Sequence, residues 1–186
     1  MRELYTKLSK RFPLGELTEQ RHNLAFLSID KEQLRPLLLH LRDKENFSHL
    51  VLLTAVDWLE DHALEDGSLD EQKFQLTYLL SNRNMGTDIG LRVMISRKDA
   101  VMESIHDIWP TAATYQRELR EMFGIDFPDS PGVYDDFILE GWNNIPPYRR
   151  DFDTLKFSQD TFSQRPGRET KDPAQHMKQQ LYPYGA

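Results

Sequence analysis

Apolar residues in the N-terminal part of the chain recur with the period of β-strands. They alternate with polar residues over residues 73–80 and 89–95, which predicts two strands with one buried face each. Residues 81–88 between them are few and rich in turn formers, so these strands are expected to form an antiparallel hairpin. Residues 49–58 are apolar almost without interruption, which favours a buried strand, and residues 23–29 predict another.

Helical spacing of apolar residues predicts helices before and between these strands. A short amphipathic helix at the start carries four apolar residues on one face: Leu4, Tyr5, Leu8 and Phe12. Further on, Asp30 and Gln33 resemble a capping box that opens a helix through Leu41. Pro36 removes one hydrogen bond from that helix, so a late start or a kink is expected.

Two more helices are predicted after the hairpin. Ser96 and Asp99 can cap a helix over residues 100–108. Residues 114–123 form the second, and Gly124 suits the left-handed position that ends a helix. The apolar face of the second helix is formed by Tyr115, Leu119, Met122 and Phe123.

The periodic pattern ends after this helix, which divides the chain into two parts. Residues 1–124 predict a compact α+β domain of two layers, with a mainly antiparallel sheet of about four strands packed on helices. Residues 125–186 hold seven of the ten prolines and show no period, which is too long a stretch for an ordinary loop. They also contain aromatic residues, which seek a surface to bury against: Trp142, Tyr148, Phe152, Phe157 and Phe162. We therefore predict a long irregular C-terminal arm that wraps a partner subunit.

Composition narrows the possible functions. The 186 residues include no cysteine, which excludes disulfides, thiolate zinc sites and cysteine-ligated iron–sulfur clusters. A net charge of -7, without a basic stripe, disfavours nucleic acid as a partner. No stretch approaches the length of a transmembrane helix and the start does not resemble a signal peptide, so a cytoplasmic protein is expected.

Candidate catalytic residues are few. Glu118, Glu121 and Asp126 could serve a free-standing carboxylate-dependent hydrolase, but charges on a helix are far more often solvated. The acidic cluster at residues 57–66 lacks the spacing of a calcium loop, so a solvated loop is favoured. The six histidines form no metal-binding pair, and no glycine-rich phosphate loop occurs.

Arginines of the C-terminal part suit a different role. Arg149 and Arg150, like Arg165 and Arg168, lie in segments with no helical pattern, where their guanidinium groups could bind carboxylates of a partner. A merely soluble tail explains them equally well.

One segment resembles a known family. Residues 116–127 read Gln-Arg-Glu-Leu-Arg-Glu-Met-Phe-Gly-Ile-Asp-Phe. They are similar to the pattern E-R-E-x-x-D-M-F-G-I-x-F of the 30-kDa subunit, also called the C subunit, of proton-pumping NADH:quinone oxidoreductase, respiratory complex I. Gln116 and Glu121 stand where the pattern has Glu and Asp. The resemblance extends over about residues 1–155, including the predicted strands.

The chain departs from the family pattern just after this segment. The family continues with G-H-P-x-L-x-R-I-L, whereas Ser130 here replaces the histidine and Asp135 and Asp136 replace the basic pair. The later element P-L-R-K-D-[FY] is kept at residues 147–152. Related subunits occur in energy-converting membrane-bound hydrogenases and formate hydrogenlyases, which are therefore the alternative.

The resemblance implies a non-catalytic, cofactor-free structural subunit of the peripheral arm, which supports electron transfer to quinone coupled to proton translocation. It would dock on the large quinone-site subunit of the 49-kDa type and contact iron–sulfur subunits. Iron–sulfur clusters, flavin and quinone are expected on those partners, and no catalytic or metal-binding residue is expected here. The protein would associate peripherally with the inner face of the membrane, without direct insertion. The interface residues that the resemblance implies are Arg117, Glu118, Phe123, Gly124, Pro131, Trp142, Arg149, Arg150 and Asp151.

Overall fold

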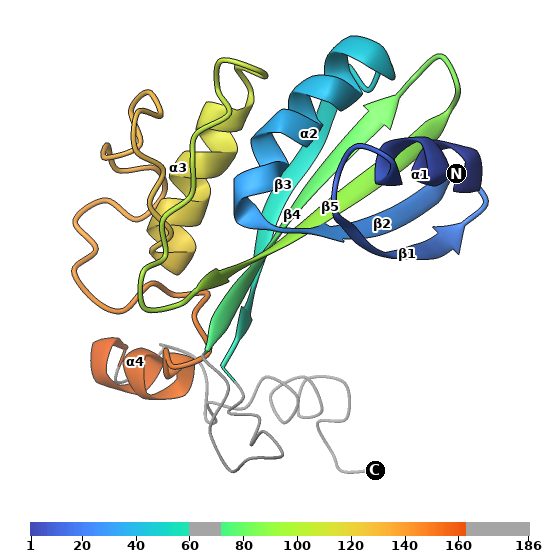
Figure 1. Ribbon diagram of the computed structural model, residues 1–186. Helices are drawn as coiled ribbons and strands as arrows, with labels where there is room; N and C mark the ends of the chain where they lie inside the picture. Colours follow the sequence, from blue (N-terminus) through green and yellow to red (C-terminus); the bar gives the residue numbers. More distant parts are fainter. Residues whose placement is uncertain (60–71, 163–186) are drawn as a thin grey trace, which may run out of the picture. The chain divides into compact units, whose positions relative to one another are not determined.

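The computed structural model describes residues 1–59 and 72–162 (Figure 1). The chain divides into two units, Met1–Phe152 and Asp153–Ala186. The described part of the second unit contains the helix α4 (Thr154–Thr161), which begins where the Asp153 side chain accepts a hydrogen bond from the backbone N–H of Lys156 at 2.9 Å.

The first unit is built on a mixed sheet with the strand order β1-β2-β5-β4-β3 in its described part. All neighbouring strands are antiparallel except β2 and β5, which are parallel. The predicted α+β class and the predicted hairpin, now β4 and β5, are confirmed. The strands are β1 (Leu14–Arg21), β2 (Leu24–Ile29), β3 (His49–Trp58), β4 (Lys73–Asn82) and β5 (Thr87–Ser96).

Strand β1 was missed by the sequence pattern, which predicts about four strands. Its residues are exposed or half-buried because it is an edge strand that pairs with β2 alone. Such a strand buries too little of either face to show a period of two. The irregular register between Leu14 and Leu17 disturbs the alternation further.

Strand β3 differs from its prediction in burial. Its bounds match residues 49–58, but it is the other edge strand of the sheet and only one of its faces is covered. Val51, Leu52, Val56 and Trp58 are each about 40% exposed. The nearly continuous apolar run therefore does not mean burial on both faces here.

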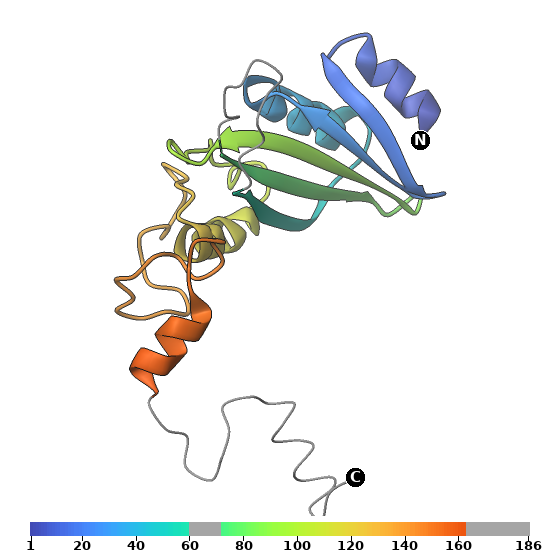
Figure 2. The same cartoon turned by 90° about the horizontal axis from the view of Figure 1, so that it is seen from below.

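The helices pack on one side of the sheet and form the core with it. Helix α1 (Arg2–Ser9) contacts β1, and Figure 2 shows the two side by side. Helix α2 (Lys31–Lys44) contacts β5, and α3 (Ala112–Phe123) contacts β3. On β4, buried and half-buried residues alternate, and no helix of the described residues covers the half-buried face.

Helix α2 runs through Pro36 without interruption. Pro36 is exposed, so the carbonyl group that loses its intrahelical partner can be hydrated instead. Asp30 occupies the predicted N-cap position, but its side chain makes no capping hydrogen bond. The capping box is therefore present in the sequence pattern only.

The helix predicted over residues 100–108 is wrong. Met102 donates its backbone N–H to the carbonyl of Asp126 at 2.8 Å, and the N–H of Asp126 bonds the carbonyl of Ala100 at 2.7 Å. Residues 100–102 thus form a parallel bridge with residue 126, and such a bridge requires extended backbone. The hydroxyl of Ser96 accepts from the N–H groups of residues 98 and 99 and closes a turn there instead of a helix.

The compact unit extends past residue 124, where the sequence pattern ends. Ile125, Phe127 and Val133 are at most 2% exposed and belong to the main apolar core. Residues 125–152 therefore pack on the chain's own sheet and helices. That residues after 124 wrap a partner stays a prediction, and residues 163–186 lie outside the described part.

Candidate functional site

Helix α3 is the base of the candidate site. Its inner face places Leu119, Met122 and Phe123 in the core, in agreement with the predicted apolar face. Gly124 ends the helix with a left-handed φ of 77°, and its N–H bonds the carbonyl of Arg120 at 2.9 Å. The predicted glycine cap is confirmed, and the chain turns back along the helix from this point.

An aromatic contact fixes the end of the returning segment. The ring of Phe123 packs edge-to-face on Phe74 of β4 at 6.1 Å between centroids, and on Tyr148 at 5.7 Å. The N–H of Tyr148 donates to the carbonyl of Met122 at 3.0 Å. Residues 124–148 thus form a loop that begins and ends at the C-terminal end of α3.

The carboxylate of Glu121 orders the middle of this loop. It accepts hydrogen bonds from the backbone N–H of Phe137 at 2.7 Å and of Ile138 at 2.9 Å. Partial burial disfavours the charge, but the backbone N–H groups of Phe137, Ile138 and Leu139 outweigh it and lower the pKa of Glu121. The carboxylate is thereby engaged with the backbone, which leaves no free acid–base group for a hydrolase at this position.

Arg117, one turn earlier on α3, holds the preceding residues of the loop. Its guanidinium group donates to the carbonyl of Asp135 at 3.1 Å and to that of Asp136. It also lies 5.4 Å from the centre of the Phe137 ring. Together, Arg117 and Glu121 bind consecutive backbone groups of an irregular segment to a regular helix.

A buried polar cluster joins α3 to both flanking segments. The hydroxyl groups of Ser104 and Ser130 donate to the side-chain oxygen of Gln116 at 2.8 and 2.7 Å. His106 lies within hydrogen-bond distance of Ser104, at 3.0 Å. Gln116 is completely buried, and its side-chain nitrogen has no hydrogen-bond partner among the described residues. The cluster fixes the first part of the loop through residue 130.

A second polar cluster fixes the segment that follows the loop. Arg97 is paired with the buried Asp57 at 3.0 Å and with Asp151 at 2.7 Å, and Asp57 also accepts the backbone N–H of Arg150 at 2.9 Å. Arg149 lies 3.5 Å from Asp151. Burial opposes ionisation of Asp151, but the hydrogen bond from Arg97 prevails and lowers its pKa.

Several interface residues implied by the sequence have contacts within the chain. Phe123 is buried, Arg117 holds the loop, and Arg149 and Asp151 belong to the ion-pair cluster. Trp142 donates its ring N–H to a carbonyl of the same loop at 3.1 Å. All five residues thus have partners within the chain.

The remaining implied residues differ in exposure. Gly124, Pro131 and Arg150 are exposed, and Glu118 is half-buried on α3. Whether they contact a partner stays a prediction. Arg165 and Arg168 lie outside the described residues. The same holds for residues 60–66 of the acidic cluster.

The loop presents four apolar residues to solvent, of which the sequence pattern singles out Tyr148 alone. The exposed fractions are 62% for Tyr134, 64% for Ile138, 42% for Ile145 and 58% for Tyr148. Four large apolar side chains exposed on one fixed loop make this loop a candidate interaction surface. Tyr134, Ile138 and Ile145 gave no signal in the sequence, because a segment without a period does not assign its apolar residues to a buried or an exposed side.

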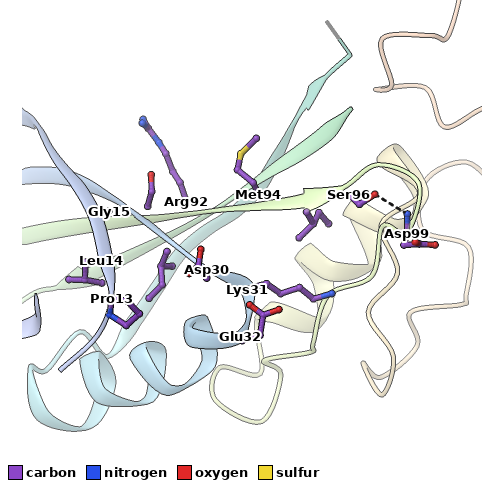
Figure 3. Close-up of a pocket in the computed structure, with 13 residues that line it drawn as sticks. Pro13, Leu14, Gly15, Asp30, Lys31, Glu32, Arg92, Met94, Ser96 and Asp99 are labelled. Carbon is purple, nitrogen blue, oxygen red and sulfur yellow. Dashed lines mark hydrogen bonds between the residues drawn. The ribbon is translucent and has the colours of Figure 1, made fainter. Parts of the chain in front are cut away.

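A surface hollow lies elsewhere, between β1, the end of β5 and the start of α2 (Figure 3). Its volume is about 730 Å³. Arg92 and Met94 project from one side of β5 in Figure 3, whereas Lys31 and Glu32 lie on the opposite side with α2. Its polar groups do not converge on one point, as a specific ligand site requires.

Neither a metal site nor a membrane span is found in the part of the chain that the structure describes. No group of three or more histidine or acidic side chains there is placed to hold an ion. Among the same residues, no helix has the length and apolar character needed to cross a bilayer.

Comparison with known proteins identifies the family. Residues 27–158 match the family model of the respiratory-chain NADH dehydrogenase, 30 Kd subunit. The chain belongs to this 30-kDa subunit family. The match begins in β2 and includes α3 with its loop.

Relatives of the 30-kDa family include both short and long chains. The chain is 30% identical over 151 residues to the C subunit of NADH-quinone oxidoreductase from Moorella thermoacetica, covering 78% of this chain and 90% of that protein. It is 36% identical over 154 residues to the C/D subunit of the same enzyme from Shewanella woodyi, covering 81% of this chain but 25% of that protein. The chain therefore spans about a quarter of the length of such C/D relatives.

Solved structures share the fold of this 30-kDa family member. A chain of the membrane-bound sulfane sulfur reductase, an archaeal respiratory membrane complex, superposes with a TM-score of 0.75 at 24% identity, covering 92% of this chain and 96% of that one. The trypsin-resistant fragment (1–134) of Nqo5 gives a TM-score of 0.55 at 21% identity, covering 70% of this chain and 96% of the fragment.

Proposed function

We propose that this chain is the 30-kDa scaffold subunit of a multisubunit NADH-quinone oxidoreductase and carries no cofactor of its own. The observation that carries the proposal is the family match over residues 27–158. This range includes α3 and the loop that Arg117 and Glu121 hold. The contribution of the chain to electron transfer and proton translocation is then the correct assembly of subunits that carry the redox groups.

Docking on the large, 49-kDa type subunit accounts for the surface of the loop. Tyr134, Ile138 and Tyr148 are each more than half exposed on a segment whose backbone is fixed. Aromatic and aliphatic side chains on a preorganised loop lose little entropy when a partner covers them. Arg150 and Pro131, both exposed, extend this surface.

The names of the C/D relatives support the same choice of partner. Each of these relatives is named as a C part and a D part in one protein. This chain matches about a quarter of the length of the C/D relative from Shewanella woodyi. We propose that the D part corresponds to the large partner, that iron–sulfur subunits lie nearby, and that these partners hold the iron–sulfur clusters, flavin and quinone. The complex would hold this chain at the inner face of the membrane.

Co-purification tests the proposal. A tagged copy of the chain, expressed in its source cells, should be recovered from detergent-solubilised membranes with a large partner subunit and with NADH-quinone reductase activity. Deletion of the chain should remove this activity, and the tagged copy should restore it. Recovery of the chain alone, at 21.9 kDa, would refute the proposal.

A second candidate is the equivalent subunit of an energy-converting membrane-bound hydrogenase or formate hydrogenlyase. The observation that favours it is the changed segment after α3, where Ser130, Asp135 and Asp136 depart from the complex I pattern. The same purification separates the two candidates. Reduction of the purified complex by hydrogen or formate, with no response to NADH, would decide for the second.

A further inference from the structure

We propose that the loop after α3 binds a protein surface with an apolar centre and a rim of lysine and arginine. This inference rests on the proposed function, in which the chain has a protein partner, and it specifies the chemistry of that partner's surface. The apolar part consists of Tyr134, Ile138, Ile145 and Tyr148, and the charged part of Asp129, Asp135, Asp136 and Glu140. We call these eight residues the acidic-apolar surface.

The loop holds the apolar side chains outward because its polar groups are satisfied internally. Glu121 binds the N–H groups of residues 137 and 138, and the Asp136 carboxylate accepts the N–H of Gly141 at 3.3 Å. The ring N–H of Trp142 donates to the carbonyl of Ile145 at 3.1 Å. A partner therefore meets a surface that is already ordered.

The residues of the loop itself carry charge of one sign, whereas Arg117 and Arg120 of α3 lie against the rings of Phe137 and Tyr134. Residues 121–148 contain six carboxylates and neither lysine nor arginine. Two of the six are compensated: Glu121 by backbone N–H groups, and Asp126 by Arg120 at 3.9 Å. The other four form no ion pair in the part of the chain that the structure describes, and all four are exposed. The four carboxylates without an ion pair among the described residues are Asp129, Asp135, Asp136 and Glu140.

This charge selects the class of partner. Anionic lipid surfaces and nucleic acids would be repelled, because their attraction requires basic residues. A second copy of the chain is also disfavoured, since it carries a net charge of -7 and the same acidic loop. A protein surface with basic residues around an apolar depression complements both parts of the acidic-apolar surface.

Charge reversal at two positions tests the proposal. Asp135 and Glu140 are suitable because neither side chain has a hydrogen bond or ion pair among the described residues, so we expect D135K/E140K to fold like the wild type. D135N/E140Q removes the charge without reversing it. E3K/E16K, two exposed acidic residues in α1 and β1, is the matched control for net charge.

The assay follows the release of each tagged variant from the purified membrane complex. The rate of release is measured at increasing salt concentrations. At low salt we expect at least tenfold faster release of D135K/E140K than of the wild type, with D135N/E140Q intermediate and E3K/E16K unchanged. At about 1 M salt, where charges are screened beyond roughly 3 Å, the differences should disappear. Ile138→Ser should speed release at every salt concentration.

The outcomes separate the two proposals. If the wild-type chain is not retained in any complex, the proposed function fails. If the chain is retained but D135K/E140K behaves like E3K/E16K, the basic rim is refuted while the scaffold function stands. Binding of the purified chain to phosphatidylglycerol vesicles would also refute the proposal that the partner is a protein with basic residues. Thermal unfolding of each variant shows whether a loss of retention reflects loss of folding.

Discussion

Glu121 shows how a single carboxylate can order a segment that has no secondary structure. Its two oxygens bind the N–H groups of Phe137 and Ile138, which no helix or sheet satisfies. Hydrogen bonds to a charged group contribute about 1.5–3 kcal/mol each, more than those between neutral groups. The sequence pattern identifies Glu121 only as a charge on a helix, because its partners are backbone groups that any residue could supply.

Replacing Glu121 with glutamine should destabilise the protein by about 1–3 kcal/mol, because the amide keeps the shape but loses the charge. Urea unfolding followed by circular dichroism measures the change. Hydrogen exchange at the amides of Phe137 and Ile138 should quicken at the same time. Glu118→Gln is the control, since Glu118 has no hydrogen bond or ion pair in the described part of the chain, and an equal loss there would contradict the assignment.

The same carboxylate predicts a dependence of stability on pH. Its folded pKa is lowered from the ordinary value of 4.5, so the folded state binds fewer protons than the unfolded state. The stabilisation is complete above about pH 4.5 and is lost as the pH falls through the lower folded pKa. Unfolding free energies of the wild type and of Glu121→Gln should therefore converge in acid, and a constant difference down to about pH 2 would speak against this mechanism.

Gln116 and Ser130 differ together from the family pattern, which has Glu and His there, and their side chains are 2.7 Å apart. We expect Gln116→Glu to destabilise the protein, because a carboxylate would be buried, and Ser130→His to restore part of the loss by supplying a cation. A double-mutant cycle at about pH 6, where histidine is largely protonated, should give a favourable coupling of about 1–3 kcal/mol. Additive effects would show that the side chains at positions 116 and 130 have no energetic coupling. A cycle that combines Glu118→Gln with Ser130→His provides the additive reference.

At the scale of elements, the sequence predicts the helices and strands that show a clear hydrophobic period or a recognisable cap. The β4–β5 hairpin, α2, and α3 with its Gly124 cap follow from local patterns, because each buries one complete face. β1 and the extended residues 100–102 do not, since their structure depends on partners distant in the chain, β2 and Asp126. The candidate site follows the same division: α3 was predicted, whereas the polar contacts that hold its loop were not.

The Asp57–Arg97 pair connects β3, the residue that follows β5, and the segment after the loop. Both side chains are at most 9% exposed, and Asp57→Asn leaves the Arg97 guanidinium group with Asp151 as its only carboxylate partner among the described residues. The variant should therefore cost about 1–3 kcal/mol, measured by chemical denaturation. Arg2→Ala breaks an exposed pair with Glu19 and should cost less than about 1 kcal/mol. Similar costs for the two variants would show that the buried pair does not hold these elements together.

For the whole molecule, the position at which the compact unit ends determines how much burial of apolar side chains contributes to its stability. Ile125, Phe127 and Val133 lie beyond residue 124 and are almost fully buried. At about 1.5–3 kcal/mol for each buried side chain, they contribute roughly 5–9 kcal/mol, comparable with the entire stability of a typical domain. A boundary at residue 124 would remove this contribution and expose the core of α3.

Two truncated chains test this conclusion. Residues 1–152 should unfold cooperatively on heating, with the near-ultraviolet circular dichroism of packed aromatic side chains. Residues 1–124 should lack both properties and bind a hydrophobic dye, because the apolar surface that Phe127 and Ile125 cover would be open to water. If residues 1–124 instead melted cooperatively within a few degrees of residues 1–152, the loop after α3 would be an appendage. The compact domain would then end where the periodic sequence pattern ends, and the partner alone would have to hold the loop in place.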